Sequence, residues 1–350
     1  MTPIRRLPAQ GCILLAVLAL AACGGGGGGG GAQGSATPST PPVVTVPPPT
    51  TPVDPTPPAS APSAPPTDTG PGSSITCTSG DTPVVAAANF ELVNAVRADA
   101  GVPQLVYLPA LGATAQDHAR YVAFNGNSGS SETAGLPCFT GATVEERLAA
   151  AGVAPVQRPG MRPHGESVLA YDAPSSAAFG PAKIVEDALN NLYGRMLLLN
   201  PMAQQGGVGM SVQPQRRALV LDVAGAADAS ASSDSFAVWP RDGSTGLPVR
   251  MLASNMKPLD AALTEGYPVT LHALAPVQVS RFAMTYAGSG NPVAATLVTS
   301  ANDRHAFLSQ NEAALVPEAP LAAGTQYRVE LDAIVGTTAV HRSWLFTTAP

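Results

Sequence analysis

Charged side chains are scarce in this chain. Only 12% of the 350 residues are Asp, Glu, Lys or Arg, and the formal net charge is -6 at pH 7. A balance of this size provides neither a positive field for the phosphates of a nucleic acid nor a trap for acidic substrates. We therefore expect no nucleic acid among the partners of this protein.

Short catalytic motifs are also missing. The sequence has no Gly-x-Ser-x-Gly nucleophile elbow and no His-Glu-x-x-His zinc helix. The glycine run at Gly24–Gly31 precedes no helical pattern, so it does not fit a phosphate-cradling loop. Glu145 and Glu146 are adjacent on an expected helix and point about 100° apart, which argues against a paired-carboxylate site.

The first quarter of the chain lacks the large apolar residues that a core requires. Proline, threonine, serine and alanine dominate residues 35–72, after the glycine run. Such a composition cannot offset the entropy of ordering, so residues 24–76 are predicted to form a disordered linker, flexible at the glycines and extended further on. At about 3 Å per residue in the proline-rich part, the linker could span on the order of 100 Å.

A short leader precedes this linker. Arg5 and Arg6 supply a basic start, and Ile13–Leu20 is an apolar run too short to cross a bilayer. This layout is typical of a secretory signal over residues 1–23. The ending Leu-Ala-Ala-Cys resembles the bacterial lipobox, which implies that Cys23 becomes the acylated first residue of the mature protein. An ordinary signal peptide with an incidental cysteine is the alternative.

The residue after the cysteine bears on the destination. Gly24 stands where the lipoprotein sorting pattern would place a retention aspartate, and this favours the outer membrane. We therefore expect an exported protein that is lipid-anchored to the bacterial envelope. The membrane, through this anchor, is its first expected partner.

Two of the four cysteines remain for the folded part. Cys12 lies in the leader and Cys23 is the lipid attachment site, which leaves Cys77 and Cys138 as a pair in an oxidising compartment. We predict a disulfide between them. Closing a loop of about 60 residues would stabilise the fold by about 4 kcal/mol in the chain-entropy model and would pin the linker to the first domain.

Helical periodicity begins after the first of these cysteines. Helices are expected around residues 90–97, from about Pro109, at 144–151 and at 184–196, and the first should end at Gly101-Val102-Pro103. Two strands, Gly207–Val212 and Ala218–Val223, then form a predicted hairpin. Helices followed by strands indicate a layered arrangement of both element types.

The order of several segments resembles the CAP superfamily, also called the SCP or PR-1-like family. The segments are Leu92–Arg97 with Gly101–Pro103, Ala115–Tyr121, Phe139–Thr143, Gly165–Ser167, and Leu197–Pro201 with Gly207–Gly209. The resemblance spans about residues 89–223 and implies an αβα sandwich with a broad central cleft. We assign residues 77–228 to this domain.

Strand-like alternation replaces helical periodicity from Asp234 onward. Turn signals recur every ten or so residues, as in a β-sandwich of about seven strands. The segments Trp239–Gly243, Gly266–Val269, Leu321–Tyr327 and Trp344–Thr348 resemble the Ig-like module at the C-terminal side of bacterial CAP proteins. We therefore expect an all-β Ig-like sandwich at 234–350, and the fold class of the chain is predicted to be α+β.

The CAP resemblance implies a cleft with two histidines and two acids, a set able to hold a divalent metal or to do acid–base chemistry. Both histidines are replaced here. Ser130-Ser131-Glu132 stands where a His-x-Glu string is expected, and Gly194 stands in place of the second histidine. Only Glu166 matches a cleft acid, with Glu186 or Asp187 as alternatives for the second.

A site built from other residues, in place of the lost histidines, is the alternative. His164 and Glu166 would point to the same side of an extended strand, and Glu132 could join them. A zinc site needs at least three protein ligands, and a surface histidine beside a structural glutamate is the simpler interpretation. We predict no metal and no cofactor, with a divalent metal as the alternative.

The other histidines are interpreted as structural or solvated. His118 lies on the buried side of the second helix and is expected to be a hydrogen-bonded core residue. His272, His305 and His341 have no ligand spacing and are expected to face solvent.

The interpretation that follows is a membrane-anchored, extracytoplasmic CAP-domain lipoprotein that binds rather than catalyses. An envelope protein, a glycan or a lipid is the expected ligand, and the fold class alone does not choose among them. One alternative is a weak metal-dependent hydrolase of envelope peptide or glycan that uses Glu166 with His164. The other is a carrier of a hydrophobic ligand such as a lipid or sterol.

Overall fold

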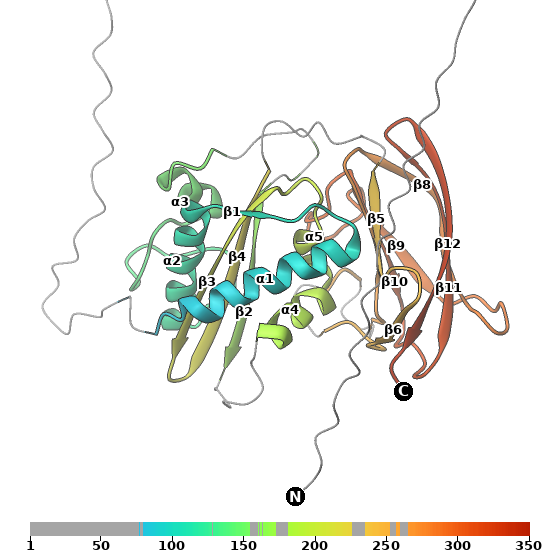
Figure 1. Ribbon diagram of the computed structural model, residues 1–350, viewed down its shortest axis with the longest axis horizontal. Coiled ribbons are helices and arrows are strands. Elements are labelled where there is room, and N and C mark those ends of the chain that lie inside the picture. The colour runs from blue at the N-terminus through green and yellow to red at the C-terminus, as the bar shows by residue number, and fades with distance from the viewer. Residues whose placement is uncertain are drawn as a thin grey trace, which may run out of the picture. The chain divides into compact units, whose positions relative to one another are not determined.

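The computed structural model describes residues 77, 80–127, 129–154, 160, 162, 164–172, 181–225, 235–252, 257–259 and 265–350. These residues form five helices and twelve strands, and the strands make three four-stranded sheets (Figure 1). The predicted α+β class is confirmed. The expected leader and linker, residues 1–76, lie outside the described residues.

The first sheet has the strand order β1-β3-β4-β2. Its centre is the predicted hairpin, in which β3 (Gln205–Gln213) and β4 (Arg216–Ala224) pair antiparallel. On the far side of β4 lies β2 (Gly165–Asp172), also antiparallel. The short strand β1 (Val106–Tyr107) is parallel to β3 and forms the other edge.

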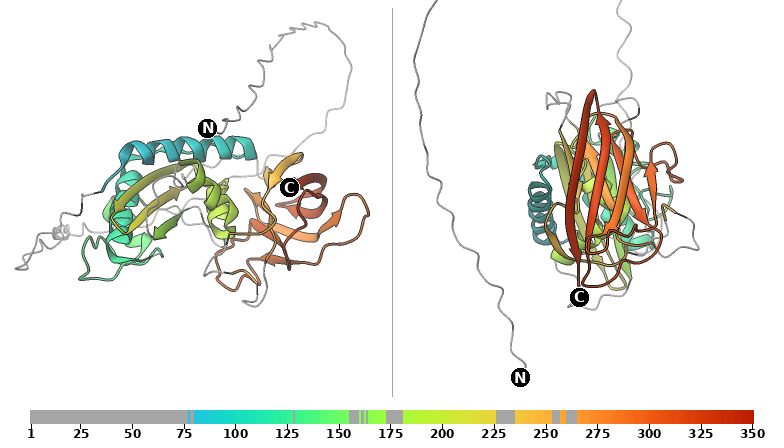
Figure 2. Two further views of the ribbon diagram at one scale, coloured as in Figure 1. Left: turned by 90° about the horizontal axis from the view of Figure 1, so that it is seen from below. Right: turned by 90° about the vertical axis from the view of Figure 1, so that its right-hand side faces the viewer.

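Helices cover both faces of this sheet because the residues of β4 alternate between two apolar clusters. Leu219 and Leu221 belong to the cluster that contains α1 (Pro83–Ala100) and α4 (Pro181–Asn190). Ala218 and Val220 belong to the cluster of α2 (Pro109–Asn125). The result is a helix–sheet–helix arrangement, with α1 running along one face (Figure 2).

Glycines allow α2 to approach the sheet closely. A Cβ at Gly207 would lie 2.1 Å from the backbone nitrogen of Gly112, and one at Gly209 would lie 2.1 Å from that of Gln116. Side chains on β3 at these positions would push the helix away. The Gly-Val-Gly string of the sequence therefore sets the position of α2, which carries His118.

Two helices differ from the sequence-based expectation in detail. The predicted helix at 184–196 is divided into α4 and α5 (Leu192–Leu198), because the side chain of Asn191 accepts a hydrogen bond from Gly194 N at 3.0 Å and caps a new helix. Between α2 and β2 lies α3 (Val144–Ala150), as predicted.

The C-terminal region is built from eight strands in two sheets, in agreement with the all-β expectation. One sheet has the order β5-β7-β10-β9 and contains β5 (Phe236–Trp239), β7 (Val269–Ala273), β10 (Glu312–Pro317) and β9 (Ala295–Thr299). The other has the order β6-β12-β11-β8 and contains β6 (Ser244–Leu247), β12 (Thr338–Thr348), β11 (Gln326–Val335) and β8 (Val277–Tyr286). Assignment to the Ig-like class stays a prediction.

The histidine on β7 corrects an expectation. His272 was expected to face solvent, but it is fully buried. Every residue of β7 is buried, so neither side of the strand meets water. Burial, together with the charges of Arg195 and Arg97, lowers the pKa of His272 to about 3. It is therefore a neutral side chain, hydrogen-bonded at 2.9 Å to Thr270 Oγ1.

All described residues belong to one compact unit, Pro71–Pro350. Within it, Leu192 and Met196 of α5 share an apolar cluster with Ala314 and Val316 of β10. Among the described residues, no helix combines the length and the apolar character that crossing a membrane requires.

Candidate functional site

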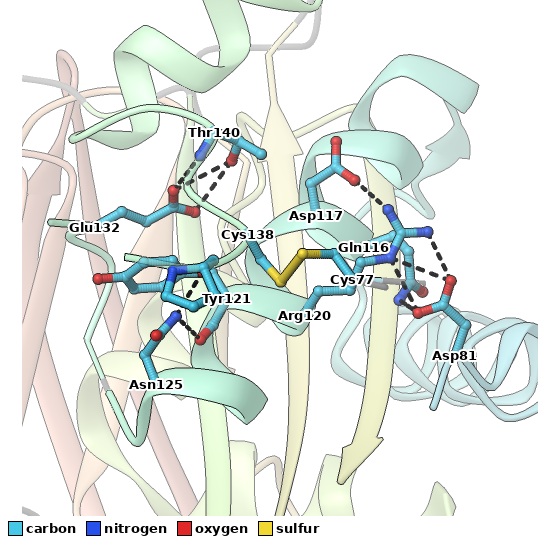
Figure 3. Close-up of a disulfide and its surroundings, with 11 residues drawn as sticks. Cys77, Asp81, Gln116, Asp117, Arg120, Tyr121, Asn125, Glu132, Cys138 and Thr140 are labelled. Atoms are coloured by element: carbon cyan, nitrogen blue, oxygen red, sulfur yellow. Dashed lines mark hydrogen bonds and ion pairs between the residues drawn. A yellow bond between two sulfur atoms is a disulfide. The ribbon is translucent and has the colours of Figure 1, made fainter. Parts of the chain in front are cut away.

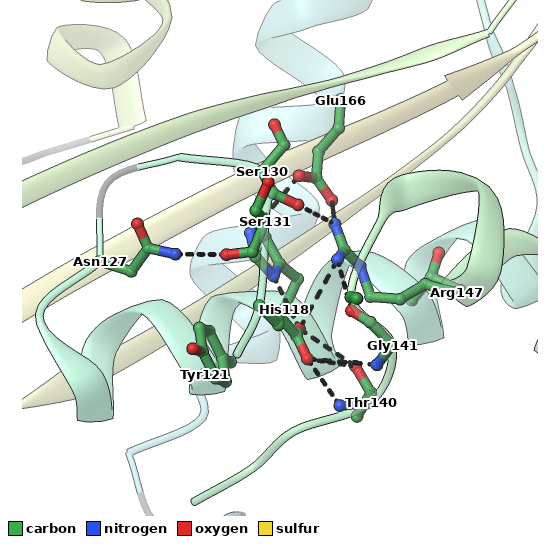
Figure 4. Close-up of polar contacts among 12 residues, drawn as sticks. His118, Tyr121, Asn127, Ser130, Ser131, Thr140, Gly141, Arg147 and Glu166 are labelled. Carbon is green, nitrogen blue, oxygen red and sulfur yellow. Dashed lines mark hydrogen bonds and ion pairs between the residues drawn. The ribbon is translucent and has the colours of Figure 1, made fainter. Parts of the chain in front are cut away.

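Five ionisable side chains meet where the first sheet packs against α2 and α3. We refer to these five residues as the charge cluster. They are His118 from α2, Glu132 from the following loop, Arg147 from α3, Glu166 from β2 and Asp222 from β4. All five residues are buried or nearly so, and the side chains of the first four are at most 2% exposed. Figure 4 shows His118, Arg147 and Glu166 pointing toward one another.

His118 has an oxygen acceptor at each ring nitrogen. Its Nδ1 lies 2.8 Å from Glu132 Oε1, and its Nε2 lies 3.1 Å from the carbonyl oxygen of Gly129 and 3.4 Å from Glu166 Oε1. A neutral imidazole has only one N–H donor, whereas the imidazolium has two. Each ring nitrogen of His118 therefore faces at least one oxygen acceptor. The expectation of a buried, hydrogen-bonded histidine here is confirmed.

Arg147 supplies a positive charge to the cluster. Its Nη2 donates to Glu166 Oε2 at 2.7 Å and to the carbonyl oxygen of Ser130 at 3.0 Å, and its Nη1 donates to that of Gly141 at 3.1 Å. The guanidinium also lies 3.9 Å from Glu132 Oε1. The Arg147 guanidinium thus faces both carboxylates, and pairing of this kind allows charges to remain buried.

Glu132 is fixed by its own loop. Its carboxylate accepts hydrogen bonds from Thr140 N at 2.6 Å, Thr140 Oγ1 at 3.1 Å and Gly141 N at 3.3 Å. The chain between Gly129 and Thr140 therefore folds back on itself around this carboxylate. We call this segment the 129–140 loop.

Asp222 is the fifth member of the cluster. It is paired with Glu166 in the register of β4 and β2, and its Oδ2 accepts from Thr114 Oγ1 at 2.6 Å. Burial raises the pKa of Asp222 well above its usual range, and the nearby charge of Glu166 raises it further.

The predicted disulfide is present beside this cluster. Cys77 and Cys138 are bonded, with their Cα atoms 5.6 Å apart, and Cys138 belongs to the 129–140 loop (Figure 3). Next to it, Arg120 Nη2 pairs with Asp81 Oδ2 at 2.6 Å, and Gln116 donates to the same carboxylate at 2.9 Å (Figure 3). These contacts hold the start of the described chain against α2.

Only two of the three candidate cleft residues, Glu166 and Glu132, lie close together in the structure. Glu166 and Glu132 both lie in the charge cluster, but His164 Nε2 is 3.7 Å from Glu145 Oε1. The histidine that joins the two acids is His118. No group of three or more His, Cys, Asp or Glu residues arranged to hold a metal occurs in the part of the chain that the structure describes.

The alternatives for a second cleft acid lie elsewhere. Asp187 is buried, accepts a hydrogen bond from Tyr171 Oη at 2.8 Å and forms an ion pair with Lys183. Glu186 is exposed. Sequence reasoning missed Arg147 and Asp222. A signal for Asp222 existed, since it is a lone acid within the apolar strand Ala218–Val223.

Position 194, where the sequence resemblance predicts the second family histidine, has no room for a side chain. A Cβ at Gly194 would lie 2.9 Å from the carbonyl oxygen of Ala188 and 3.4 Å from its Cα. Both atoms belong to the backbone of α4, so neither can rotate away. The turn between α4 and α5 therefore requires glycine at this position.

Apolar space near α1 and α4 is small. The cavity lined by Val93, Ile184 and Leu221 has a volume of about 10 Å³. This is about the space that one water molecule needs, far below the volume of a fatty-acid chain or a sterol. The closed packing offers no ready site for such a ligand.

Comparison with known proteins agrees with this architecture. Residues 90–223 match the model of CAP, the Cysteine-rich secretory protein family. Over this segment the chain is similar to the CAP family. A search of curated proteins found no match.

Several solved structures are similar to this chain. An extracellular protein containing a SCP domain from Bacillus anthracis is 19% identical, with a TM-score of 0.31, and the match covers 40% of each chain. An outer surface protein from Borrelia burgdorferi is 14% identical (TM-score 0.32; 42% of this chain and 96% of that one). The CAP domain of Enterococcal PrgA is 18% identical (TM-score 0.29; 43% and 64%).

Proposed function

We propose that this chain is an exported lipoprotein, acylated at Cys23 and anchored to the bacterial outer membrane, whose CAP domain binds an envelope partner without catalysing a reaction. The partner is an envelope protein, a glycan or a lipid surface, and no metal or cofactor takes part. Nucleic acid is not a partner, since the chain carries few charges and a net charge of -6.

The burial of Glu166 carries the proposal. A catalytic acid or base must come within hydrogen-bond reach of a substrate atom or of one bridging water. The Glu166 side chain is 1% exposed, and Arg147 and His118 lie against its two oxygens. A carboxylate buried in this way, with one oxygen bonded to Arg147 and the other facing His118, is out of reach of a reactant from bulk solvent.

The geometry at position 194 supports the same conclusion. The residue that would replace the family histidine has no side chain, and the backbone of Ala188 excludes one. His164 pairs with Glu145, so it does not complete a set with Glu166. These two observations support a cleft that lacks the histidine expected at position 194 and in which His164 does not take its place.

Metal analysis tests the proposal against the hydrolase alternative. The purified chain is treated with a chelator, reloaded with zinc, dialysed and measured by inductively coupled plasma mass spectrometry. The proposal predicts no bound zinc above the level of a His341→Ala control. Stoichiometric zinc that disappears in a Glu166→Ala, His164→Ala double variant would overturn it in favour of a metal-dependent hydrolase.

A thermal-shift measurement tests the carrier alternative. The packing near α1 and α4 predicts that fatty acids or sterols do not raise the melting temperature by binding in this region. A saturable rise that is lost on enlarging Val93 to phenylalanine would show that this region opens to bind a hydrophobic ligand.

A further inference from the structure

We propose that the Cys77–Cys138 disulfide latches the 129–140 loop as a lid over the charge cluster, so that reduction of this bond opens the cluster to solvent. This inference goes beyond the proposed function, because it assigns a conformational role to a bond and a loop that binding without catalysis does not require. It does not depend on the lipid anchor.

The loop forms the cover of the cluster. It supplies the carbonyl oxygen of Gly129 to His118, the carbonyl oxygen of Ser130 to Arg147, and Glu132 itself. Without the loop, His118 would lose both oxygen contacts that the segment provides. The closed loop therefore contributes to the near-zero exposure of His118 and Arg147.

The latch lies within the same segment. Cys138 is situated between Glu132 and Thr140 in the sequence, and these two residues are joined by the hydrogen bond from Thr140 N. The bond to Cys77 connects this segment to the chain just before α1. A covalent link at Cys138 thus restrains the part of the loop that places Glu132 against His118.

Apolar packing contributes little to holding the loop closed. Its two large apolar side chains, Leu136 and Phe139, are 43% and 38% exposed. Two neutral hydrogen bonds connect the loop to α2, from Thr133 N to Tyr121 Oη at 2.7 Å and from Asn125 Nδ2 to the carbonyl oxygen of Pro137 at 2.8 Å. A segment with few buried apolar contacts opens more readily than the core.

The backbone at the latch also favours opening once the bond is cut. Cys138 has a φ of 62°, in the left-handed region that residues other than glycine rarely adopt. Such a conformation persists when the surrounding structure enforces it. Releasing the side chain from Cys77 removes one of the restraints that enforce it.

The chemistry of opening is thiol–disulfide exchange with an external dithiol. A thiolate of the dithiol attacks one sulfur of the half-buried bond, and a mixed disulfide forms as the other cysteine leaves as a thiolate. The second thiol of the reagent then displaces the remaining cysteine. The dithiol is oxidised to its disulfide by two electrons, and both cysteines end as thiols after proton uptake.

Histidine modification tests the lid directly. The oxidised chain and the chain reduced with dithiothreitol and then alkylated with iodoacetamide are treated with diethylpyrocarbonate at pH 7, and peptides are quantified by mass spectrometry. The labelling rate of His118 should rise at least about tenfold on reduction, since a loop of this kind opens once its cross-link is lost. A Cys77→Ser, Cys138→Ser double variant should label similarly without reductant.

Two other histidines serve as internal controls. The side chain of His341 is 73% exposed and should react equally in both states, whereas the buried His272 should stay protected. If His118 stays protected while both cysteines are alkylated, the lid does not depend on the latch and the proposal is wrong. If His272 becomes reactive together with His118, the bond supports the whole fold rather than a local lid, and the proposal is equally overturned.

Discussion

Replacing Arg147 with methionine should lower the free energy of unfolding by about 3–5 kcal/mol, the usual cost of leaving a buried charge without its partner. The guanidinium is 2% exposed and its Nη2 lies 2.7 Å from Glu166 Oε2. Methionine fills much of the same volume, but it leaves Glu166 and Glu132 without the guanidinium that they face. Urea unfolding at pH 7, extrapolated to water, measures the change.

A second arginine provides the matched control. Arg241 pairs with Asp99 at 2.6 Å, but the two side chains are 53% and 43% exposed. Arg241→Met should cost less than about 1 kcal/mol, because water screens such pairs. Adding Glu166→Gln to Arg147→Met should recover part of the loss by removing the unpaired charge. If Arg147→Met costs no more than Arg241→Met, the cluster is solvated and the reasoning fails.

Two further predictions concern pH and position 194. Burial raises the pKa of Glu312 from 4.5 to about 7 although Ser309 donates to its carboxylate. Because the folded state holds this proton more tightly, the stabilisation is complete below about pH 4.5 and is lost as the pH rises through about 7, a change of about 3 kcal/mol. Glu312→Gln should remove that slope in urea unfolding at pH 4.5 and 8, and an unchanged slope would contradict the assignment. Gly194→His should destabilise the fold by about 1–3 kcal/mol, since its Cβ meets Ala188 O at 2.9 Å; an unchanged melting temperature, or a gain of bound zinc, would refute this.

Much of the fold could be predicted because its signals are local. Gly101 ends α1 with a φ of 77°, as the Gly-Val-Pro string suggested, and the glycines of β3 mark the close approach of α2. The all-β region was indicated by strand alternation and regular turn signals. The division of α4 from α5 at Asn191 was missed, because the apolar periodicity continues through the cap.

The charge cluster could be predicted only in part, because its members come from five separate segments. Glu132 and Glu166 were candidates, and His118 was expected to be buried and hydrogen-bonded. The contact of His118 with both acids depends on how the 129–140 loop folds over α2. Arg147 lies 19 residues from Glu166 in the sequence, and no periodicity connects a helix to the strand it meets.

Carboxyl labelling of the native, oxidised chain tests the central claim most directly. Carbodiimide activation with glycinamide modifies carboxylates that solvent can reach, and peptide mass spectrometry quantifies each site. The sealed cluster predicts that Glu145, with a side chain 65% exposed, is modified, while Glu132 and Glu166, at 0% and 1%, stay unmodified in the folded protein. Modification of Glu166 at a rate close to that of Glu145 would show an open cleft with an available acid and would contradict the account of a non-catalytic CAP domain.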